Sequence, residues 1–320
     1  MRRFTAGENE TGMRISRFVE KVTYSLPEAV LYKSFRNKRV KINGKKAAPA
    51  DRLAPGDVVE LYINDEFFAP EPAAVAGRPE RPPLPFPDIL WENNQLAVLY
   101  KPAGLLCHSD ATGDTTLQQM FVEYLTQKGE YLPDKEHSFT PSLCNRIDRG
   151  TEGLVLAAKT YPALREANAL LRNRLLTKTY LCITTASPPE GLHTAYLQRD
   201  MAEKTTHISL VPAPGAQEIK TEIHLCEQKG SLCLCEIGLH TGRTHQIRAH
   251  LAFMGAPLWG DRKYGKPAAN LRGQALCAWT LRFPPVLPED SILFPLAGQC
   301  FKATHPTLLQ AWQKLNSNIE

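Results

Sequence analysis

Asp148 is the residue whose neighbours most favour a chemical role. It stands between Arg146 and Arg149 in the segment CNRIDRGTEG, and the apolar run LVLAA follows directly. Flanking cations favour the ionised form of a carboxylate, and the two glycines permit a tight turn with the backbone close to a ligand. A charged acid on a sharp loop before a core strand is typical of catalytic groups. The same window also fits an aspartate in an ordinary surface turn with two solvated arginines.

The cysteines and histidines do not form a metal-binding pattern. Cys233 and Cys235 would share one face of an extended strand, but a second pair at zinc spacing is missing. His240, His245 and His250 recur at five-residue steps, which does not keep three side chains on one face of a helix. We therefore expect buried thiols and no metal.

Length and composition indicate a globular protein of more than one domain. The chain has 320 residues, of which 43% are hydrophobic and 22% are charged. No apolar run is long enough to span a bilayer, and the N-terminal MRRFT lacks the apolar core of a secretory signal. We expect a monomer in the cytoplasm that does not bind membranes.

The positive charge is concentrated near the N-terminus. The net charge is +5, and residues 1–65 contain 13 Lys or Arg against 8 Asp or Glu. Between Lys33 and Lys46 there are seven basic residues and no acidic residue. Such a concentration suggests a polyanion as partner, most simply a nucleic acid, although a solvated charged face has the same composition.

Residues 13–63 have the pattern of a compact module. Apolar spacing predicts helices over residues 14–24 and 26–35. Alternation over residues 39–45 ends in Asn-Gly, a hairpin signal, and another strand is expected over residues 58–63.

This pattern resembles a small RNA-binding domain first described in a small-subunit ribosomal protein and also found in bacterial tyrosyl-tRNA synthetases. In that domain, two helices and a small sheet present a basic surface to structured RNA. The resemblance implies RNA as the partner of this chain. The basic positions expected to contact it are Arg14, Arg17, Lys33, Arg36, Lys38, Arg39, Lys41, Lys45 and Lys46.

A proline-rich segment follows the module. Residues 66–88 hold seven of the 25 prolines, from Pro70 to Pro87. Such a segment favours extended, semi-rigid conformations and forms no core. We expect a linker that lets the small basic domain, residues 1–65, move relative to a catalytic domain, residues 89–320.

Strand and helix signals alternate through residues 89–320. Short connections between them predict a mixed, largely antiparallel α+β domain. Thr160 and Pro162 mark the start of a helix, with Leu164, Ala167, Leu171 and Leu175 expected on one face. Three strands and a further helix are expected over residues 96–100, 153–159, 178–183 and 244–255.

Five short motifs together resemble the RluA-type pseudouridine synthases. Residues 145–153, NRIDRGTEG, are similar to that family's HRLDRxTSG signature. Residues 241–248, TGRTHQIR, match its corresponding segment at every position. Three further segments, YKPAGLLCH, KTY and GDRKYG, follow the family's order at residues 100–108, 178–180 and 260–265.

Two positions depart from the commonest form of the signature. Asn145 stands where His is frequent, and Glu152 stands where Ser is frequent. Neither change alters Asp148. Glu152 does add a negative charge near Asp148, and the sequence leaves the orientation of that side chain open.

The resemblance implies the isomerisation of uridine to pseudouridine within RNA, most simply large-subunit (23S) ribosomal RNA. The glycosidic bond breaks, the uracil turns, and the ring rejoins the sugar through carbon, so no cofactor is needed. A base inside structured RNA must first be flipped out into a pocket.

The resemblance also assigns roles to four residues. Asp148 would be the catalytic acid, either attacking the sugar or removing a ribose proton. Tyr180 would stack on the flipped uracil, and its hydroxyl would assist the final proton loss. Arg243 would pair with Asp148 and keep it ionised. Arg146 would contact the RNA where the base has left the stack.

Two other functions fit parts of the sequence. The charge concentration and the linker would also suit a non-catalytic rRNA-binding assembly factor. Asp148 and Glu152 could form the carboxylate pair of a hydrolase, but a glycine-bearing loop gives such a pair no fixed geometry.

Overall fold

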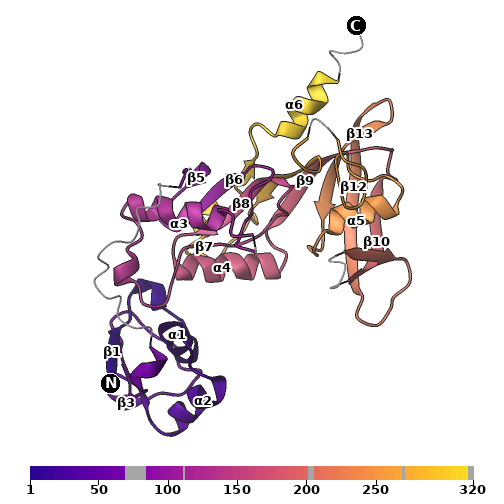
Figure 1. The fold of residues 1–320 in the computed structure, drawn as a ribbon. Coiled ribbons are helices and arrows are strands. Elements are labelled where there is room, and N and C mark those ends of the chain that lie inside the picture. Colours follow the sequence, from indigo (N-terminus) through magenta and orange to yellow (C-terminus); the bar gives the residue numbers. More distant parts are fainter. Residues whose placement is uncertain (69–83, 111, 201–204, 269–270, 316–320) are drawn as a thin grey trace.

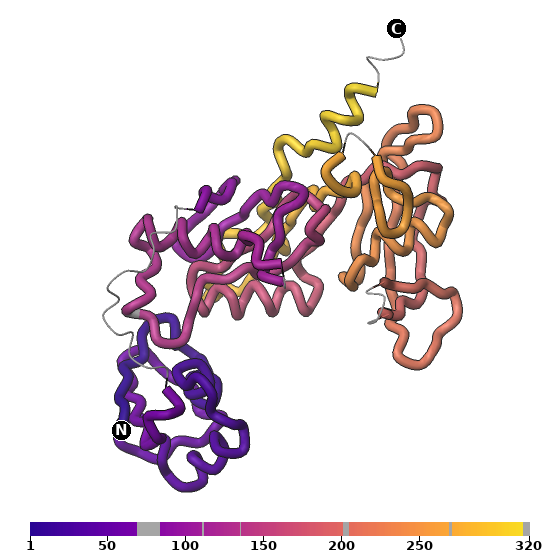
Figure 2. The backbone as a smooth tube through the Cα atoms, viewed as in Figure 1, coloured from indigo at the N-terminus to yellow at the C-terminus, as the bar shows by residue number. Residues whose placement is uncertain are grey.

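The structure is a computed structural model, and it describes residues 1–68, 84–110, 112–200, 205–268 and 271–315. Its strands form a four-stranded sheet near the N-terminus and an eleven-stranded sheet in the rest of the chain (Figure 1). The backbone trace places the N-terminal sheet domain at one end of the molecule and the C-terminal helix at the other (Figure 2). The expected mixed α+β architecture is confirmed.

The N-terminal domain is built from short elements around its own core. Phe18, Leu31, Phe35 and Val59 are buried in that core. The sheet order is β1-β4-β2-β3. The two expected helices are present with slightly shifted ends, whereas β1 was not expected. The elements are β1 (Arg2–Thr5), α1 (Ile15–Val22), α2 (Glu28–Arg36), β2 (Val40–Ile42), β3 (Lys45–Lys46) and β4 (Val58–Leu61).

The predicted Asn-Gly hairpin joins β2 to β3. Asn43 and Gly44 both have positive φ, at 50° and 77°. Two consecutive residues of this kind give the turn whose twist matches that of antiparallel strands. The turn brings the basic residues of β2 and β3 next to each other, with Lys41 opposite Lys46.

Direct contacts join the N-terminal domain to the large domain. The Asn9 amide donates to Glu136 Oε1 over 2.7 Å, and the Tyr161 backbone N–H donates to Asn9 Oδ1 over 3.1 Å. Ser138 Oγ donates to Glu10 Oε1 over 2.6 Å. The two domains therefore touch in addition to being linked along the chain.

Most of the expected linker, residues 69–83, lies outside the described residues. Its ends belong to ordered elements. Asp65–Phe67 forms a short 3-10 helix, and Phe68 is buried in the N-terminal core. The other end, Asp88, begins a strand of the large sheet.

The large sheet is mostly antiparallel. Its order is β11-β10-β12-β13-β9-β14-β8-β6-β5, with β15 paired to β14 and β7 paired to β8. Among the strand pairs of the described residues, only β8 with β14 is parallel. Its strands are β5 (Asp88–Glu92), β6 (Leu96–Lys101), β7 (Ser142–Leu143), β8 (Glu152–Ala158), β9 (Thr177–Thr184), β10 (Gly191–Arg199), β11 (Thr206–Ser209), β12 (Gln217–Lys229), β13 (Leu232–Leu239), β14 (Leu276–Arg282) and β15 (Cys300–Lys302).

Strand β8 separates two cores, because successive side chains of a strand point to opposite faces. Leu154 and Leu156 join one core with residues of α4 and α6. Val155 and Ala157 join the other core with residues of α3 and α5. The bounds are α3 (Leu117–Gln127), α4 (Tyr161–Arg172), α5 (Gln246–Phe253) and α6 (Thr307–Lys314).

Helix α4 begins as predicted, and of its expected apolar residues Ala167 is buried while Leu164 and Leu171 pack partly buried against the same core. The Thr160 side chain accepts a hydrogen bond from the Ala163 N–H at the N-terminus of the helix. The buried residues are Ala163, Ala167 and Leu170. The expectation that Leu175 lies on the buried face is wrong: the helix ends at Arg172, and Leu175 is exposed.

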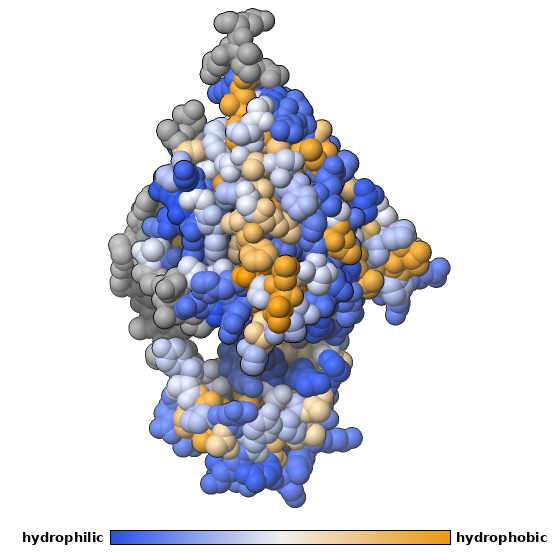
Figure 3. Space-filling view, turned by 90° about the vertical axis from the view of Figure 1, so that its right-hand side faces the viewer, coloured by the Kyte–Doolittle hydropathy of each residue, from blue (hydrophilic) through white to orange (hydrophobic). Residues whose placement is uncertain are grey.

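Seen from the right-hand side of Figure 1, the surface is mostly hydrophilic with a band of apolar side chains down its middle (Figure 3). The outline narrows where the N-terminal domain meets the rest of the molecule. None of the helices described here is long and apolar enough to cross a membrane.

Buried His250 should make stability depend on pH. Its ring is 1% exposed and lies 3.0 Å from Thr221 Oγ1, and burial lowers its pKa to about 4. His250 binds a proton near pH 6.5 in the unfolded chain but only near pH 4 in the folded chain. The free energy of unfolding therefore decreases as the pH falls from about 6.5 to about 4. We expect a loss of about 2 kcal/mol between pH 7 and pH 5, measured by urea unfolding. His250→Gln should weaken this dependence; an unchanged dependence would contradict the assignment.

Candidate active site

Asp148 lies on the loop between β7 and β8, and backbone hydrogen bonds hold this loop. Its own carbonyl accepts from Thr151 N–H over 3.0 Å. Its neighbour Arg149 is tied to the turn after β6, where Gly104 N–H donates to the Arg149 carbonyl over 2.7 Å and Arg149 Nε donates to the Gly104 carbonyl over 3.1 Å. The loop therefore presents Asp148 from a fixed backbone.

Lys101, the last residue of β6, anchors the same loop from inside. The side chain has no exposed surface, and Nζ donates to the carbonyls of Pro102, Leu105 and Arg149 at 3.0, 2.7 and 3.1 Å. Burial lowers the pKa of Lys101 to about 8, so its ammonium group remains charged at neutral pH. Three carbonyl acceptors satisfy its three N–H donors, as a buried ammonium group requires.

Arg248 on α5 is the arginine that pairs with Asp148. Arg248 Nη1 donates to Asp148 Oδ2 over 2.9 Å, while Nε and Nη2 donate to both carboxylate oxygens of Asp261 at 2.8 and 3.0 Å. Burial opposes ionisation of Asp261, but the hydrogen bonds and charge of Arg248 outweigh it and hold the pKa of that carboxyl below its usual value. One guanidinium thus bridges two carboxylates.

The expected pairing of Arg243 with Asp148 is not the one found. Arg243 is exposed in the turn before α5, and no ion pair joins it to Asp148 within the described residues. Its backbone N–H donates to Gln246 Oε1 over 3.1 Å. The helix begins at Gln246, and this start directs Arg248 rather than Arg243 toward the acid. Both arginines occur in the segment TGRTHQIR, so the segment was identified but the residue within it was not.

His245, which the sequence offered only as part of a rejected metal pattern, is a second neighbour of the acid. Its Nε2 lies 3.7 Å from Asp148 Oδ2, and its Nδ1 lies 3.0 Å from the hydroxyl of Tyr264. Burial lowers the pKa of His245, with the negative charge of Asp148 acting in the opposite direction. The residue has φ of 57° and precedes the first turn of α5.

Tyr180 lies on β9 in the same core as the loop that carries Asp148. It is 7% exposed and shares the α3 and α5 side of the sheet with Ile147. Burial first, and the nearby charge of Asp148 second, raise the pKa of Tyr180 above its usual value. The phenol therefore remains protonated at neutral pH and lies within electrostatic range of the acid.

Arg146 and Asn145 differ in environment although they are adjacent. The Arg146 side chain is exposed, whereas Asn145 is half-buried. Asn145 Oδ1 accepts from the Leu156 N–H of β8 over 2.8 Å. The residue that departs from the common signature thus has a structural contact, and Arg146 is free to face a ligand.

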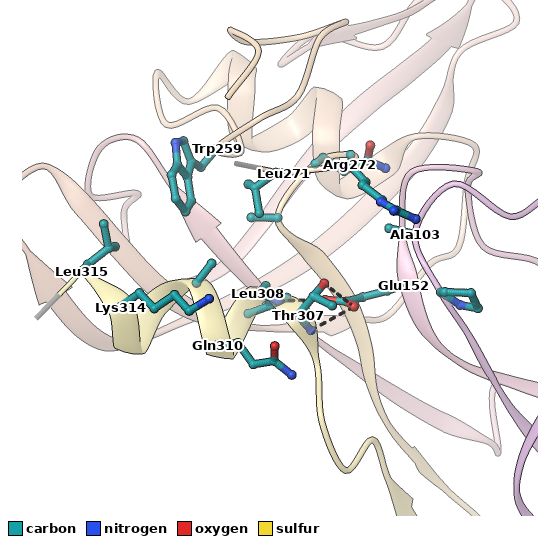
Figure 4. A pocket seen from close by; sticks show the side chains of 15 residues that line it. Ala103, Glu152, Trp259, Leu271, Arg272, Thr307, Leu308, Gln310, Lys314 and Leu315 are labelled. Carbon is teal, nitrogen blue, oxygen red and sulfur yellow. Dashed lines mark hydrogen bonds between the residues drawn. The ribbon is translucent and has the colours of Figure 1, made fainter. Parts of the chain in front are cut away.

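Glu152 is directed away from the loop of Asp148 and toward α6. Its buried carboxylate accepts from the Tyr100 hydroxyl at 2.7 Å and from Thr307 Oγ1 at 2.6 Å. It also accepts from the first two N–H groups of α6, those of Thr307 and Leu308, both at 3.0 Å (Figure 4). Glu152 therefore caps the C-terminal helix, which answers the question of its orientation.

A cavity of about 540 Å³ lies beside this cap, between α6 and the segment before β14. Trp259, Leu271 and Lys314 contribute to its wall (Figure 4). Asp148, Tyr180 and Arg248 do not line it. The cavity is on the α6 side of the sheet and is distinct from the site around Asp148. Within the described residues, no group of three or more His, Cys, Asp or Glu is placed to hold a metal ion.

The fold and these residues together match one class of protein. The family described as RNA pseudouridylate synthase matches residues 95–253, which include Asp148, Tyr180 and Arg248. A solved structure titled human RNA pseudouridylate synthase domain containing 4 shares the fold, with a TM-score of 0.56 and 21% identity, over 72% of this chain and 93% of that one. The chain belongs to the RNA pseudouridine synthase family, and its enzymatic class is RNA pseudouridine synthase.

Similarity to curated relatives extends over nearly the whole chain. An uncharacterized RNA pseudouridine synthase of Mycoplasma pneumoniae is 29% identical over 97% of this chain and 96% of its own length. Ribosomal large subunit pseudouridine synthase D of Yersinia pestis is 26% identical over 97% of this chain and 86% of its own. Ribosomal large subunit pseudouridine synthase C of Rickettsia felis is 26% identical over 79% and 81%.

The two arginines of TGRTHQIR should differ in their effect on turnover. Arg248→Gln removes the ion pair with Asp148, so we expect kcat for pseudouridine formation to fall about 100-fold or more. Arg243→Gln should leave kcat within a few-fold, because that side chain is exposed. Tritium release from RNA labelled at uracil C5 measures the rate, and circular dichroism at the assay temperature checks that both variants are folded. Equal losses of kcat in the two variants would contradict the pairing.

Glu152 should contribute to stability through α6. Glu152→Ser leaves the Tyr100 hydroxyl and the N–H groups of α6 without their acceptor, and we expect unfolding to become easier by about 2–4 kcal/mol. Glu152→Gln retains a carbonyl oxygen as acceptor and should lose less. Denaturant unfolding of both variants measures this order. The reverse order, or no change in either variant, would show that the hydrogen bonds of Glu152 to α6 do not contribute to the free energy of unfolding.

Proposed function

We propose that this enzyme converts specific uridines of large-subunit ribosomal RNA to pseudouridine in the cytoplasm. The observation that carries the proposal is the carboxylate of Asp148, held by Arg248 at 2.9 Å with His245 and Tyr180 beside it. The choice of RNA is supported by relatives named as large-subunit pseudouridine synthases. It is also supported by the basic N-terminal domain.

In the proposed reaction, the target uridine leaves the RNA helix and enters the site around Asp148. The N1–C1′ bond breaks, the uracil turns and C5 bonds to C1′. C5 then loses its proton and N1 gains one, so that the product is an isomer of the substrate. Asp148 would either attack the sugar through a carboxylate oxygen or remove a ribose proton, and the hydrogen bond from Arg248 over 2.9 Å would hold the carboxylate in place for either role.

Tyr180 and Arg146 would serve the flipped nucleotide. Tyr180 is buried, close enough for the charge of Asp148 to help raise its pKa, and its ring would stack on the uracil. Its hydroxyl is protonated at neutral pH and would take part in the final proton loss by hydrogen bonding. Arg146, exposed two residues before Asp148, would occupy the place that the base leaves in the RNA.

We further propose that the N-terminal domain is the RNA-docking module that its sequence resembles. Of its nine expected RNA-contacting residues, only Arg17 forms an ion pair among the described residues, with Glu20 at 2.9 Å. The other cations are therefore available to phosphates. All except Lys41 are exposed; Lys41 is half-buried, with Nζ 4.9 Å from the centre of the Tyr62 ring.

Asp148→Asn tests the reaction and the substrate together. We expect the purified variant to form no detectable pseudouridine while binding rRNA fragments with an affinity within a few-fold of wild type, because the change removes one charge from a site far smaller than the RNA interface. Pseudouridine mapping of rRNA in a deletion strain should show missing large-subunit positions. A wild-type copy of the gene should restore these positions, and a copy with Asp148→Asn should not.

Two outcomes would contradict separate parts of the proposal. Full activity of Asp148→Asn would show that Asp148 takes no part in the reaction. The deletion strain could instead keep all pseudouridines of large-subunit rRNA and lose pseudouridines from another RNA. That result would leave the enzyme class in place and show that the substrate is the other RNA.

A further inference from the structure

The N-terminal domain has an apolar hollow with a basic rim. Its volume is about 450 Å³. Phe35 and Ala47, both buried, form the floor, and Tyr32 and Pro49 form walls. Arg36 and Lys46, both exposed, stand at the rim.

Two rigid elements hold these groups in place. Tyr32 and Arg36 are four residues apart on α2, so their side chains lie on one face of the helix. Lys46 ends β3, which the Asn-Gly turn pairs to β2. The floor belongs to the core of the domain. The hollow is therefore preformed and does not depend on a loop closing over it.

Tyr32 is available to a ligand. Its side chain is 44% exposed although its neighbour Leu31 is buried in the core. An aromatic ring beside an apolar floor offers a stacking surface for a flat, apolar group. Base stacking of this kind is a main source of affinity for unpaired nucleic acid.

The charge around the hollow selects an anionic ligand. Residues 29–50 contain seven basic residues and no acidic residue. The nearest acid in the sequence, Asp51, accepts from the N–H of Ala48, a lining residue, over 2.7 Å. Neither Arg36 nor Lys46 forms an ion pair within the described part of the chain. A flat group carrying negative charge on both sides matches these features, and a nucleotide within an RNA strand is such a group. Bases of an A-form duplex are stacked inside the helix, so only an unpaired base could enter.

We propose that this hollow receives one unpaired base of the substrate RNA, with Tyr32 stacking on the base and Arg36 and Lys46 binding the phosphates on either side. The proposal rests on the RNA-docking role given above to the N-terminal domain. It adds that the domain distinguishes bulged or single-stranded RNA from a continuous duplex, rather than binding by charge alone.

The test compares two RNA hairpins that differ only by one bulged nucleotide, each with a fluorescent label, bound to the full-length protein. Tyr32→Ala should weaken binding of the bulged hairpin about 5- to 150-fold, the range of one lost stacking contact. Binding of the continuous hairpin, and the salt dependence of both, should not change. Tyr32→Phe should retain wild-type affinity because the ring remains.

Matched controls separate the hollow from general charge. Tyr24→Ala alters another tyrosine of the same domain, 83% exposed, and should leave both affinities unchanged. Arg36→Ala should weaken binding of both hairpins and reduce the slope of log K against log salt by about one. Circular dichroism melting of each variant confirms that the domain is folded.

Several results would overturn the proposal. One is an equal effect of Tyr32→Ala on the two hairpins; another is an effect no larger than that of Tyr24→Ala. Displacement of both RNAs by a polyglutamate peptide, with no preference for the bulge, would instead assign the hollow to an acidic protein segment. If the double variant Lys38→Ala/Arg39→Ala also leaves RNA affinity and its salt slope unchanged, the docking role of the domain fails, independently of the hollow.

Discussion

The site around Asp148 depends on one guanidinium group shared by two carboxylates. Arg248 donates through three nitrogen atoms, one to Asp148 and two to Asp261, whose side chain is completely buried. A buried carboxylate without its cation costs about 3–5 kcal/mol, so Asp261 fixes the position of Arg248 whether or not substrate is present. Arg248 then fixes the carboxylate of Asp148. The carboxylate of Asp148 is therefore oriented before RNA binds, as the role proposed for it requires.

A second buried cation acts on the backbone of the same loop. Lys101 Nζ donates hydrogen bonds to three carbonyls, and one of them belongs to Arg149, the residue after Asp148. Arg248 orients the side chain of the acid and Lys101 restrains its main chain. The two cations approach from different elements, α5 and β6. The exposed Arg146 and the partly exposed Asp148 thus lie on a loop that is rigid on its inner side and open on its outer side.

Local patterns in the sequence predicted several of the elements and drew attention to Asp148. A continuous apolar run predicted the strand that follows Asp148, and alternation ending in an Asn-Gly pair predicted the hairpin of the N-terminal domain. The choice between Arg243 and Arg248 was not accessible in this way. It depends on where α5 begins and on Asp261, which belongs to another segment. The orientation of Glu152 depends on α6, 155 residues further along the chain. Contacts over such distances leave no periodic signal.

The cap on α6 has an evolutionary consequence. Glu152 is buried, and its acceptor atoms are occupied by groups from the C-terminal helix. A serine at that position is too short to reach Thr307, and a glutamate without the helix would keep only the Tyr100 hydroxyl as a hydrogen-bond donor. Glu152 and the C-terminal helix should therefore be inherited together. Related chains with glutamate at this position should also carry the helix. Related chains without the helix should have a small residue at this position. The identity of this one residue, four positions after Asp148, would then indicate whether a related chain carries the helix.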